Sequence, residues 1–333
     1  MTKRINLTRF CGGLVLASLL FALVTGNAGA QSGGPWPAKP IKMIVPFPAG
    51  SSTDVIARIL GQMLGPRVGQ SFVIENRVGA SGMIGAEVVA HALPDGYTVG
   101  LATTSTHALA SSLSANLHYD PLRDFAPVAM IGSSPYVMVT APELATKSVE
   151  EFIALAKARP GKFTYGSAGP GSLAHLAGVL FSKLVGAELT HVPYKSSGQS
   201  VTDLMAGRLD MEFSTIPPTL PLIRNGQLKA LATTGAKRTA ALPELPTVAE
   251  AGVKGFEADL WIAMVMPAAT PQPIVARLNR ALNEVLGESE AQAALSAQGL
   301  DTEPGTPDAL RSRIAGDIER WRAIVVAAGI QPE

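Results

Sequence analysis

The feature that most constrains the fold is a regular alternation of short apolar runs with amphipathic helical stretches. The apolar run Ile41–Val45 precedes a turn-rich loop and a segment with helical apolar periodicity. A second run, Phe72–Glu75, precedes the helical stretch Ile84–Ala92, and a third run, Tyr97–Ala102, follows it. Strands that alternate with helices in this order form a mostly parallel sheet with helices on its faces. The sequence therefore predicts an α/β fold.

The same alternation restarts after the middle of the chain. Phe163–Gly166, Leu189–Val192 and Leu209–Phe213 are predicted strands with helical segments between them. Two such units, separated in the sequence, predict two α/β lobes.

The expected limits of the lobes follow from where the chain passes between the two units. Residues 36–137 and 233–333 are assigned to lobe 1, and residues 138–232 to lobe 2. The apolar runs Tyr136–Thr140 and Leu228–Thr234 are the predicted crossing strands. Because the helices after Pro273 have no strand set of their own, we expect them to pack on lobe 1.

The first thirty residues have the features of an export signal. Lys3, Arg4 and Arg9 are basic, the apolar run Cys11–Val24 is short for a membrane span, and Ala28–Ala30 is a small-residue cleavage site. The sequence thus predicts residues 1–30 as a signal peptide cleaved after Ala30, and a periplasmic mature protein without cysteine.

The charge of the chain excludes some classes of partner. The sequence has 27 basic and 26 acidic residues, and three of the basic ones lie in the predicted signal peptide. The mature chain is therefore close to neutral. This balance gives no electrostatic attraction to nucleic acid or to an anionic membrane surface.

Two loops rich in small residues come directly before predicted helices. They are Pro48–Thr53 in the first unit and Ser167–Ser172 in the second. The start of a helix presents amide groups without partners and a partial positive charge, so each loop is a candidate anion site. Two such loops that face one another across a cleft would hold a carboxylate from both sides. Gly- and Ser-rich loops before a helix also have a purely structural explanation.

Other polar residues follow predicted strands at the same edge of each sheet. Hydroxyl groups there either line a pocket or cap the next helix. The candidates that point into the cleft are Thr104, Ser105, His107, Tyr194, Ser214 and Thr215.

Known catalytic patterns are absent from the sequence. It has no G-x-S-x-G and no H-E-x-x-H motif, and the only cysteine lies in the predicted signal peptide. The five histidines show no paired spacing of metal ligands, so we expect no metal, no cofactor and no enzymatic activity. The remaining catalytic alternative is a hydrolase that uses Ser172 and His175, for which no third triad member is apparent.

Ordered motifs from about residue 36 to the C-terminus carry a family resemblance. They include Val45–Asp54, Val73–Arg77, Pro94–Thr98, Tyr119–Phe125, Tyr165–Gly169, His191–Lys195, Gly207–Asp210 and Leu242–Gly252. In these motifs the chain resembles the Bug family, the TctC-like solute-binding proteins of tripartite tricarboxylate transporters.

This resemblance implies a type II periplasmic binding protein fold, with two α/β lobes joined by two crossing strands and a ligand cleft between them. It implies capture of a small organic acid, such as a di- or tricarboxylate, an aromatic acid or an acidic amino acid. The acid would pass to the membrane permease subunits of the transporter, and a monomer is expected. A binding protein that feeds a membrane sensor is the alternative.

The resemblance also implies which residues hold the ligand. Carried over to this sequence, they are Ala49, Gly50, Ser51 and Asp54 in the first lobe and Ser167, Gly169, Gly171, Ser172 and His175 in the second. The chain departs from the family pattern at Ser51 and Ser196, where glycine is common. Each departure adds a hydroxyl group in or near the cleft.

Overall fold

The structure is a computed structural model that describes residues 36–194 and 196–332. The predicted signal peptide, its cleavage site and Lys195 of the family motif lie outside the described residues. The chain divides into two units, residues 1–38 and 39–333. The second unit contains all of the helices and strands described below.

The first sheet begins with three parallel strands. β1 (Ile41–Val45) lies between β2 (Phe72–Asn76) and β3 (Thr98–Thr103). β9 (Asp259–Pro267) then pairs with β3 in the antiparallel sense. The three predicted strands of this unit therefore form, with ends that differ by one residue at most.

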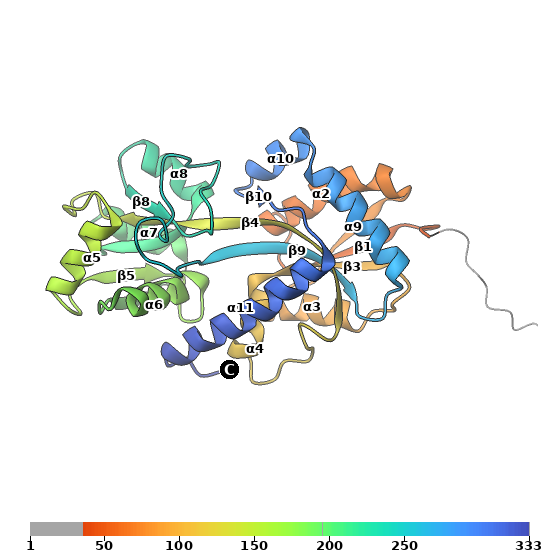
Figure 1. The fold of residues 1–333 in the computed structure, drawn as a ribbon, viewed down its shortest axis with the longest axis horizontal. Coiled ribbons are helices and arrows are strands. Elements are labelled where there is room, and N and C mark those ends of the chain that lie inside the picture. Colours follow the sequence, from red (N-terminus) through yellow and green to blue (C-terminus); the bar gives the residue numbers. More distant parts are fainter. Residues whose placement is uncertain (1–35, 195, 333) are drawn as a thin grey trace, which may run out of the picture. The chain divides into compact units, whose positions relative to one another are not determined.

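One long strand belongs to two sheets. In β4 (Phe125–Thr140), the portion Phe125–Pro135 pairs with β9. The rest, Tyr136–Thr140, pairs with β7 (Met211–Thr215) and β8 (Lys229–Thr233). Figure 1 shows β4 as it runs from the sheet of β1 and β3 into the sheet that contains β5 and β8.

The second sheet repeats the parallel arrangement of the first. β5 (Thr164–Ser167) pairs in parallel with β6 (Thr190–Pro193) on one side and with β7 on the other. Both predicted units are thus present, and the predicted α/β fold is confirmed.

The return from the second sheet to the first differs from the sequence prediction. The run Leu228–Thr234 contains β8, which pairs within the second sheet. The chain returns later, at β9. Thr234, the residue after β8, links β4 to the segment before β9. Its amide donates to Tyr136 O (2.9 Å), and its carbonyl accepts from Ala258 N (3.0 Å).

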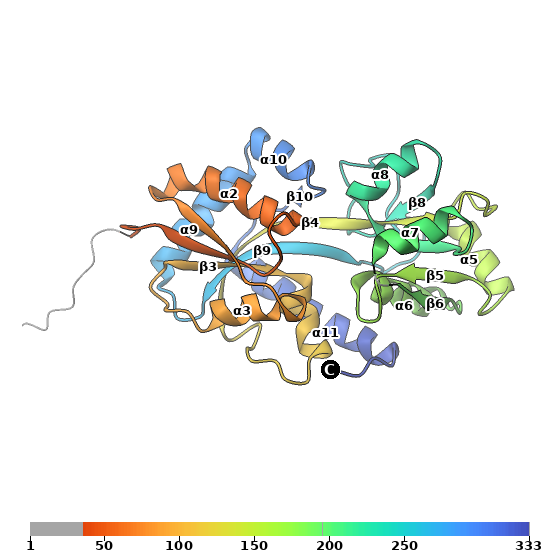
Figure 2. The ribbon, with the colours of Figure 1, turned by 180° about the vertical axis from the view of Figure 1, so that it is seen from behind.

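Helices cover both faces of the first sheet. α2 (Ser52–Val68) packs on β1 and β2, and α9 (Gln272–Leu286) packs on α2 and β4. On the other face, α3 (Met83–Ala90) packs on β1 and β3, and α11 (Pro307–Ala327) packs on β4, as both ribbon views show (Figure 2). The helices after Pro273 therefore pack on the first sheet, as predicted.

The remaining elements complete the structure. Near the first sheet they are η2 (Ala80–Gly82), η3 (Thr104–Leu109), α4 (Ala110–Leu113), α10 (Ser289–Ser296) and β10 (Asp301–Thr302). Around the second sheet they are α5 (Val149–Ala158), α6 (Leu173–Val185), α7 (Ser197–Met205) and α8 (Ile216–Arg224). α11 also contacts α6, so the C-terminal helix reaches an element of the second sheet.

Close packing explains one glycine of the second sheet's helices. A Cβ atom at Gly178 of α6 would lie 2.1 Å from Cε2 of Tyr165 on β5. Only a residue without a side chain lets the helix approach the strand so closely. This close contact fixes α6 on β5 and so fixes the position of the start of α6.

Gly178→Ala is therefore expected to lower the free energy of unfolding by about 1 to 3 kcal/mol, because the added methyl group displaces Tyr165. The matched control is Gly316→Ala in α11, where a Cβ atom would meet nothing within 4 Å. There the better helix propensity of alanine is expected to raise stability by up to about 1 kcal/mol. Urea denaturation measures both, and equal effects would contradict the packing argument.

Candidate functional site

The first cavity, of about 450 Å³, lies where β1 and β3 end and α8 begins. Residues of the first sheet's loops and strands form most of its wall, and the start of α8 closes it from the second sheet. The lining residues are Phe47, Ser51, Ser52, Thr53, Ile56, Thr103, Ser105, Ser134, Thr215, Pro217, Pro218, Leu260, Trp261, Ile262, Gln298 and Leu300.

The start of α2 supplies hydrogen-bond donors to this cavity. Ser51 caps the helix, since its hydroxyl accepts from Asp54 N at 3.3 Å. The first backbone bond of the helix runs from Val55 N to Ser51 O (2.9 Å). The amides of Ser52 and Thr53 come before that bond and have no acceptor within the helix. They are free to bind an anion at the positive end of the helix dipole.

Asp54 braces this loop from inside. Its side chain is buried and accepts from Gly50 N (2.9 Å), from Asn76 Nδ2 (2.9 Å) and from both Nε and Nη2 of Arg58 (2.9 and 3.0 Å). The hydrogen bond from Arg58 lowers the pKa of the carboxyl to about 2, although burial opposes this. The Gly50 amide therefore donates to Asp54 and is not available to a ligand. Arg58 neutralises the negative charge of Asp54, which lies close to the amides of Ser52 and Thr53.

The hydroxyl groups after β3 have different roles. Thr103 and Thr106 cap one another in a reciprocal pair, with Thr106 N donating to Thr103 Oγ1 at 3.4 Å. Thr104 is fully buried, and its hydroxyl joins η3 to β9 by accepting from Trp261 N (2.9 Å) and donating to Asp259 O (3.3 Å). Ser105 is half-buried and lines the first cavity and a second one.

His107 lies in the core. Its ring packs at 4.4 Å from the ring of Phe125, and Nδ1 lies 2.9 Å from the hydroxyl of Thr106. Burial lowers its pKa to about 3. The imidazole is therefore neutral and does not reach the cavity.

The second cavity, of about 570 Å³, lies beside the first and shares Ser105 with it. The start of α6 contributes Gly171 and Ser172, and α4 and the C-terminal segment contribute apolar groups. Its lining residues are Ala80, Ser81, Met83, Ser105, Leu109, Ala110, Leu113, Ser114, Ala168, Pro170, Gly171, Ser172, Leu173, Ile330 and Gln331.

Two residues of η2 in this cavity have an unusual backbone. Ala80 and Ser81 have φ angles of 45° and 53°, in the left-handed region that side chains other than that of glycine seldom adopt. Such conformations concentrate at binding sites, where the surrounding structure maintains them. η2 is thus a part of the site that was not predicted from the sequence, although Gly79 and Gly82, on either side of Ala80 and Ser81, are a detectable signal.

A stacked pair of imidazoles holds the loop before α6. His191 Nε2 lies 2.7 Å from Ser167 Oγ, and the His175 and His191 rings stack at 4.0 Å. His175 Nδ1 accepts from Gly171 N at 3.2 Å, so the ring is neutral. Burial lowers the pKa of His175, and burial together with the neighbouring His175 lowers that of His191 to about 4. The loop is fixed by neutral rings that do not line a cavity.

Of the three predicted polar residues at the strand ends of the second sheet, one lines a cavity. Tyr194 donates to Asp203 Oδ2 of α7 at 2.7 Å. Ser214 is buried and its hydroxyl lies 3.1 Å from that of Thr219. Thr215, the next residue, lines the first cavity.

The structure separates the predicted site residues into two groups. Those that line a cavity are Ser51, Ser105, Gly171, Ser172 and Thr215. Those that lie behind or beside the cavity walls are Ala49, Gly50, Asp54, Thr104, His107, Ser167, Gly169, His175, Tyr194 and Ser214. Ser51 and Ser172, the caps of the two helices, line neighbouring cavities.

The apolar part of the first cavity was missed by sequence analysis. Leu260 and Trp261 come from β9, Leu300 from the turn after α10, and Pro217 and Pro218 from α8. Nothing in the local sequence distinguishes these residues from ordinary core residues.

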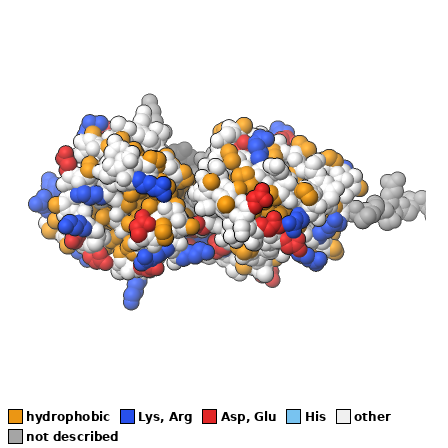
Figure 3. Space-filling model, turned by 90° about the horizontal axis from the view of Figure 1, so that it is seen from above, with side chains coloured by type: hydrophobic (Ala, Val, Ile, Leu, Met, Phe, Trp, Pro, Cys, Tyr) orange, Lys and Arg blue, Asp and Glu red, His pale blue; other side chains and the backbone are white. Residues whose placement is uncertain are grey.

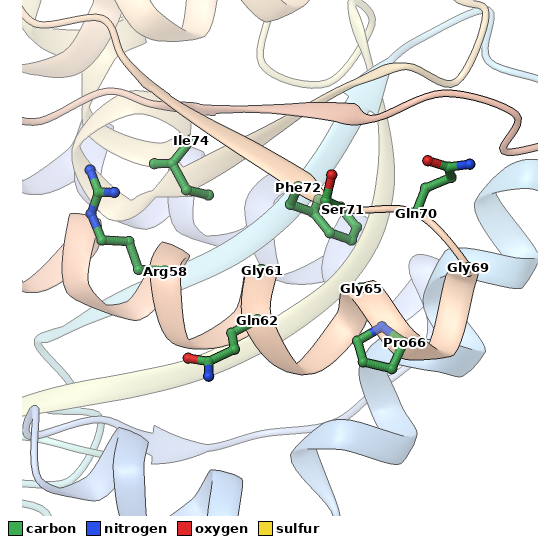
Figure 4. Close-up of a pocket in the computed structure, with 10 residues that line it drawn as sticks. All are labelled: Arg58, Gly61, Gln62, Gly65, Pro66, Gly69, Gln70, Ser71, Phe72 and Ile74. Carbon is green, nitrogen blue, oxygen red and sulfur yellow. The ribbon is translucent and has the colours of Figure 1, made fainter.

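A third depression lies away from both cavities, between α2 and β2, with a volume of about 780 Å³. Figure 4 shows it lined by the small residues Gly61, Gly65 and Gly69 of the helix side and by Phe72 and Ile74 of the strand. It shares no residue with the other two cavities, and it is not part of the candidate site.

Charged side chains are absent from the lining of the first and second cavities, as far as the described residues show. On the face drawn in Figure 3, acidic and basic side chains are interspersed without a large area of one sign. Binding at the site would therefore depend on backbone amides and hydroxyl groups.

The geometry of the hydroxyl groups gives no catalytic triad. Ser172 Oγ donates to Gly169 O (2.7 Å) and accepts from the backbone amide of His175 (3.3 Å), so the imidazole of His175 does not activate it. The Ser167–His191 contact has suitable length, but Ser167 is fully buried. Residues 36–194 and 196–332 contain no group of three or more His, Cys, Asp or Glu side chains arranged to hold a metal ion.

Comparison with known proteins assigns this arrangement to a family. Residues 56–330 match the model of the family described as "Tripartite tricarboxylate transporter family receptor". The chain belongs to this family. Over 325 residues it is 40% identical to protein BugT of Bordetella pertussis, and the aligned region covers 97% of this chain and 98% of BugT. The resemblance to the Bug and TctC proteins is therefore confirmed.

Solved structures of the family have the same fold. Rpa4515 of R. palustris, solved with adipate, is 37% identical, with a TM-score of 0.73 over 90% of this chain and all of that one. The periplasmic binding protein BugD is 32% identical, with a TM-score of 0.70 over 90% of this chain and all of that one. MatC from Rhodopseudomonas palustris, with bound malate, is 31% identical, with a TM-score of 0.68 over 87% of this chain and all of that one. The chain is thus a solute-binding protein with the periplasmic binding protein fold of its family.

Within residues 36–194 and 196–332, no helix is both long enough and apolar enough to cross a bilayer.

Proposed function

We propose that this protein is an exported, periplasmic receptor that binds a small organic acid in the first cavity and delivers it to the permease subunits of a tripartite tricarboxylate transporter. The observation that carries the proposal is the start of α2, where the amides of Ser52 and Thr53 precede the first helical hydrogen bond at the cavity wall. Solved relatives that hold adipate and malate support a carboxylate as the ligand.

The ligand carboxylate would lie against these amides. Ser51, Thr103 and Ser105 line the same cavity and add hydroxyl groups to its wall. Hydrogen bonds to a charged acceptor are stronger than those between neutral groups, and a helix start supplies them without a cationic side chain.

The elements around the first sheet and those around the second sheet are proposed as two lobes that move about β4 and β9, with the second boundary at β9 and not at residue 233. Thr215 and Pro217 of the second lobe line the same cavity as Ser51 of the first. A ligand that contacts both lobes favours the closed state, because it gains contacts that the open state does not offer. Closure would also bring the start of α6, with Ser172, toward the ligand.

Ser52→Pro tests the anion site without disturbing the helix. Ser52 is the first residue of α2, where proline is tolerated, and Ser51 has φ −67° and ψ 158°, a conformation that proline accepts after it. The variant loses one amide donor. We expect binding of the ligand to weaken by about 10- to 100-fold, as measured by isothermal titration calorimetry.

The matched control is Ser52→Ala, which removes only the hydroxyl group and keeps the amide. We expect it to retain affinity within a few-fold, with both variants unfolding as the unchanged protein does. Equal affinity in Ser52→Pro and the unchanged protein would exclude this amide from the site.

Delivery to a permease is tested in cells. Uptake of the labelled acid should cease when the gene for this chain is deleted and should return with the unchanged gene. Normal uptake in the deletion strain, with loss of a transcriptional response to the acid, would favour the sensor alternative.

A further inference from the structure

Asn76, the last residue of β2, joins this strand to the start of α2. Its Nδ2 donates to Phe47 O in the loop after β1 and to Asp54 Oδ1 in the first turn of α2, both at 2.9 Å. A carbonyl and an ionised carboxylate only accept hydrogen bonds, so the side-chain amide of Asn76 has one orientation here. One side chain therefore holds both the loop and the helix.

Asn76 reaches both halves of the loop between β1 and α2. Phe47, in the first half, lines the first cavity. Gly50, in the second half, donates its amide to Asp54 at 2.9 Å, and Asp54 is itself held by Asn76. Asn76 lines neither the first nor the second cavity, so any effect that it has on a ligand acts through the loop.

The loop before α6 is held in the same way by different side chains. Ahead of each helix, the glycine before the capping serine donates its amide to the side chain four residues later. The distances are 2.9 Å from Gly50 to Asp54 and 3.2 Å from Gly171 to His175. The two helix starts therefore share one plan, although the acceptor is a carboxylate in one and a neutral imidazole in the other.

His191 occupies the place of Asn76 in the second sheet. Each belongs to the strand that pairs in parallel with the strand before the loop, β2 with β1 and β6 with β5. His191 Nε2 lies 2.7 Å from Ser167 Oγ in the loop, and its ring stacks on that of His175 in the first turn of α6. A side chain of the neighbouring strand thus contacts both the loop and the helix in each case. This repetition with different residue types points to a role in fixing the helix start.

Resting on the proposed function, we propose that Asn76 is a positioning residue of the anion site, which holds the loop so that the amides of Ser52 and Thr53 face the ligand carboxylate. A loop that is fixed before binding loses less conformational freedom when the ligand arrives, which increases affinity. Without the two hydrogen bonds from Asn76, the loop and Asp54 adopt other positions in the unliganded protein.

The test uses the mature chain with two different changes at this position. Asn76→Asp keeps the size of the side chain but sets an acceptor against two acceptors, and Asn76→Leu removes the donor without adding a charge. Adipate and malate, which solved relatives hold, are the probes. We expect both variants to bind them at least about 10-fold more weakly in isothermal titration calorimetry, because two hydrogen bonds are lost, one of them to a charged group.

Asn279→Leu is the matched control. Asn279 of α9 is half-buried like Asn76, and its Nδ2 also donates to two acceptors, Val128 O (2.8 Å) and Gly305 O (2.9 Å). It lines neither the first nor the second cavity. We expect this variant to lose stability as Asn76→Leu does and to keep its affinity for both acids within a few-fold. Equal weakening of binding in the two variants would show that lost stability, and not the loop, is the cause.

Nuclear magnetic resonance without ligand tests the position of the loop directly. The hydrogen bond from Arg58 lowers the pKa of Asp54 to about 2, and those from Gly50 and Asn76 add to this effect. Both changes at Asn76 are expected to raise this pKa, as followed by the carboxyl carbon resonance of Asp54. The amide of Gly50 is expected to exchange its hydrogen with solvent at least about 10-fold faster, because Asp54 no longer holds it. A variant that only lost stability would change neither property.

The outcomes separate this inference from the proposed function. If the Asp54 carboxyl and the Gly50 amide behave in both variants as in the unchanged protein, or if both variants keep their affinity for the two acids, Asn76 does not position the site and the inference is overturned. If the unchanged protein binds neither adipate nor malate, the proposed carboxylate site is contradicted, while the two resonances still decide whether Asn76 holds the loop.

Discussion

Asp317→Ala is expected to lower the free energy of unfolding by about 3 to 5 kcal/mol, the usual cost of removing one partner from a buried charge cluster. Asp317 of α11 is 4% exposed. Its carboxylate accepts from Trp261 Nε1 (2.7 Å), Arg313 Nε (2.9 Å) and Arg320 Nη2 (2.9 Å). Without it, the indole loses its acceptor and both arginines lose a partner.

This cluster lies where the two sheets meet. Arg313 also binds Asp259, the first residue of β9 (2.9 Å), and Glu257, two residues before that strand (2.8 Å). Asp259 pairs with Pro135, the last residue of β4 in the first sheet. Because Trp261 forms part of the first cavity, Asp317→Ala is also expected to weaken ligand binding.

Urea denaturation measures the loss, and Glu319→Ala is its control. Glu319 lies two residues further along α11, and its side chain is 71% exposed and pairs only with Arg322 among the described residues. Exposed pairs contribute little, so we expect a change within about 0.5 kcal/mol. Similar losses in the two variants would contradict a special role for the cluster.

Glu212→Gln is expected to stabilise the protein at alkaline pH by up to about 3 kcal/mol and to leave stability nearly unchanged at about pH 4. Glu212 of β7 is fully buried, and neither carboxylate oxygen accepts a hydrogen bond of normal geometry from the described residues. Burial raises its pKa from 4.5 to about 7, which the nearby Ser200 offsets only in part.

The sign follows from the raised pKa. Below about pH 4.5 the carboxyl is protonated in both the folded and the unfolded chain, so it adds no penalty. Between about pH 4.5 and 7 the folded chain holds the proton more tightly, so the free energy of unfolding falls as the pH rises. Above about pH 7 the buried charge carries its full cost.

Denaturation of both proteins at several pH values isolates this group, because other titrating residues contribute equally to each. The difference in stability should grow from about pH 4 to 8 and then level off. A difference that is independent of pH would mean that Glu212 has the same pKa in the folded and the unfolded chain, which would contradict the raised pKa.

Local patterns predicted most of the fold. Ile41–Val45 is β1 without change, and the strands predicted near Phe72, Thr98 and Thr164 form within one residue of their expected ends. Strand and helix periods are properties of short segments, so the sequence contains them directly. The return to the first sheet was misplaced because β8 and β9 are both apolar runs, and only their pairing partners tell them apart.

The candidate site was predictable as a region and less so residue by residue. The loops before α2 and α6 both reach a cavity, since helix starts at strand ends are recognisable in a sequence. Within Thr104–His107 only Ser105 does so, because a turn decides which side chains point outward. The link from Trp261 to Asp317 joins residues 56 positions apart, and no local pattern contains it.

The start of α2 is proposed to bind the carboxylate of the ligand. Nitrogen-15 chemical shifts of the backbone amides test it directly, as a saturating acid is added to the labelled protein. We expect the largest changes in chemical shift at Ser52 and Thr53, and no change at the amides that line the third depression, between α2 and β2. If these two amides keep their chemical shifts while the acid binds, the carboxylate lies elsewhere, which contradicts the proposed site.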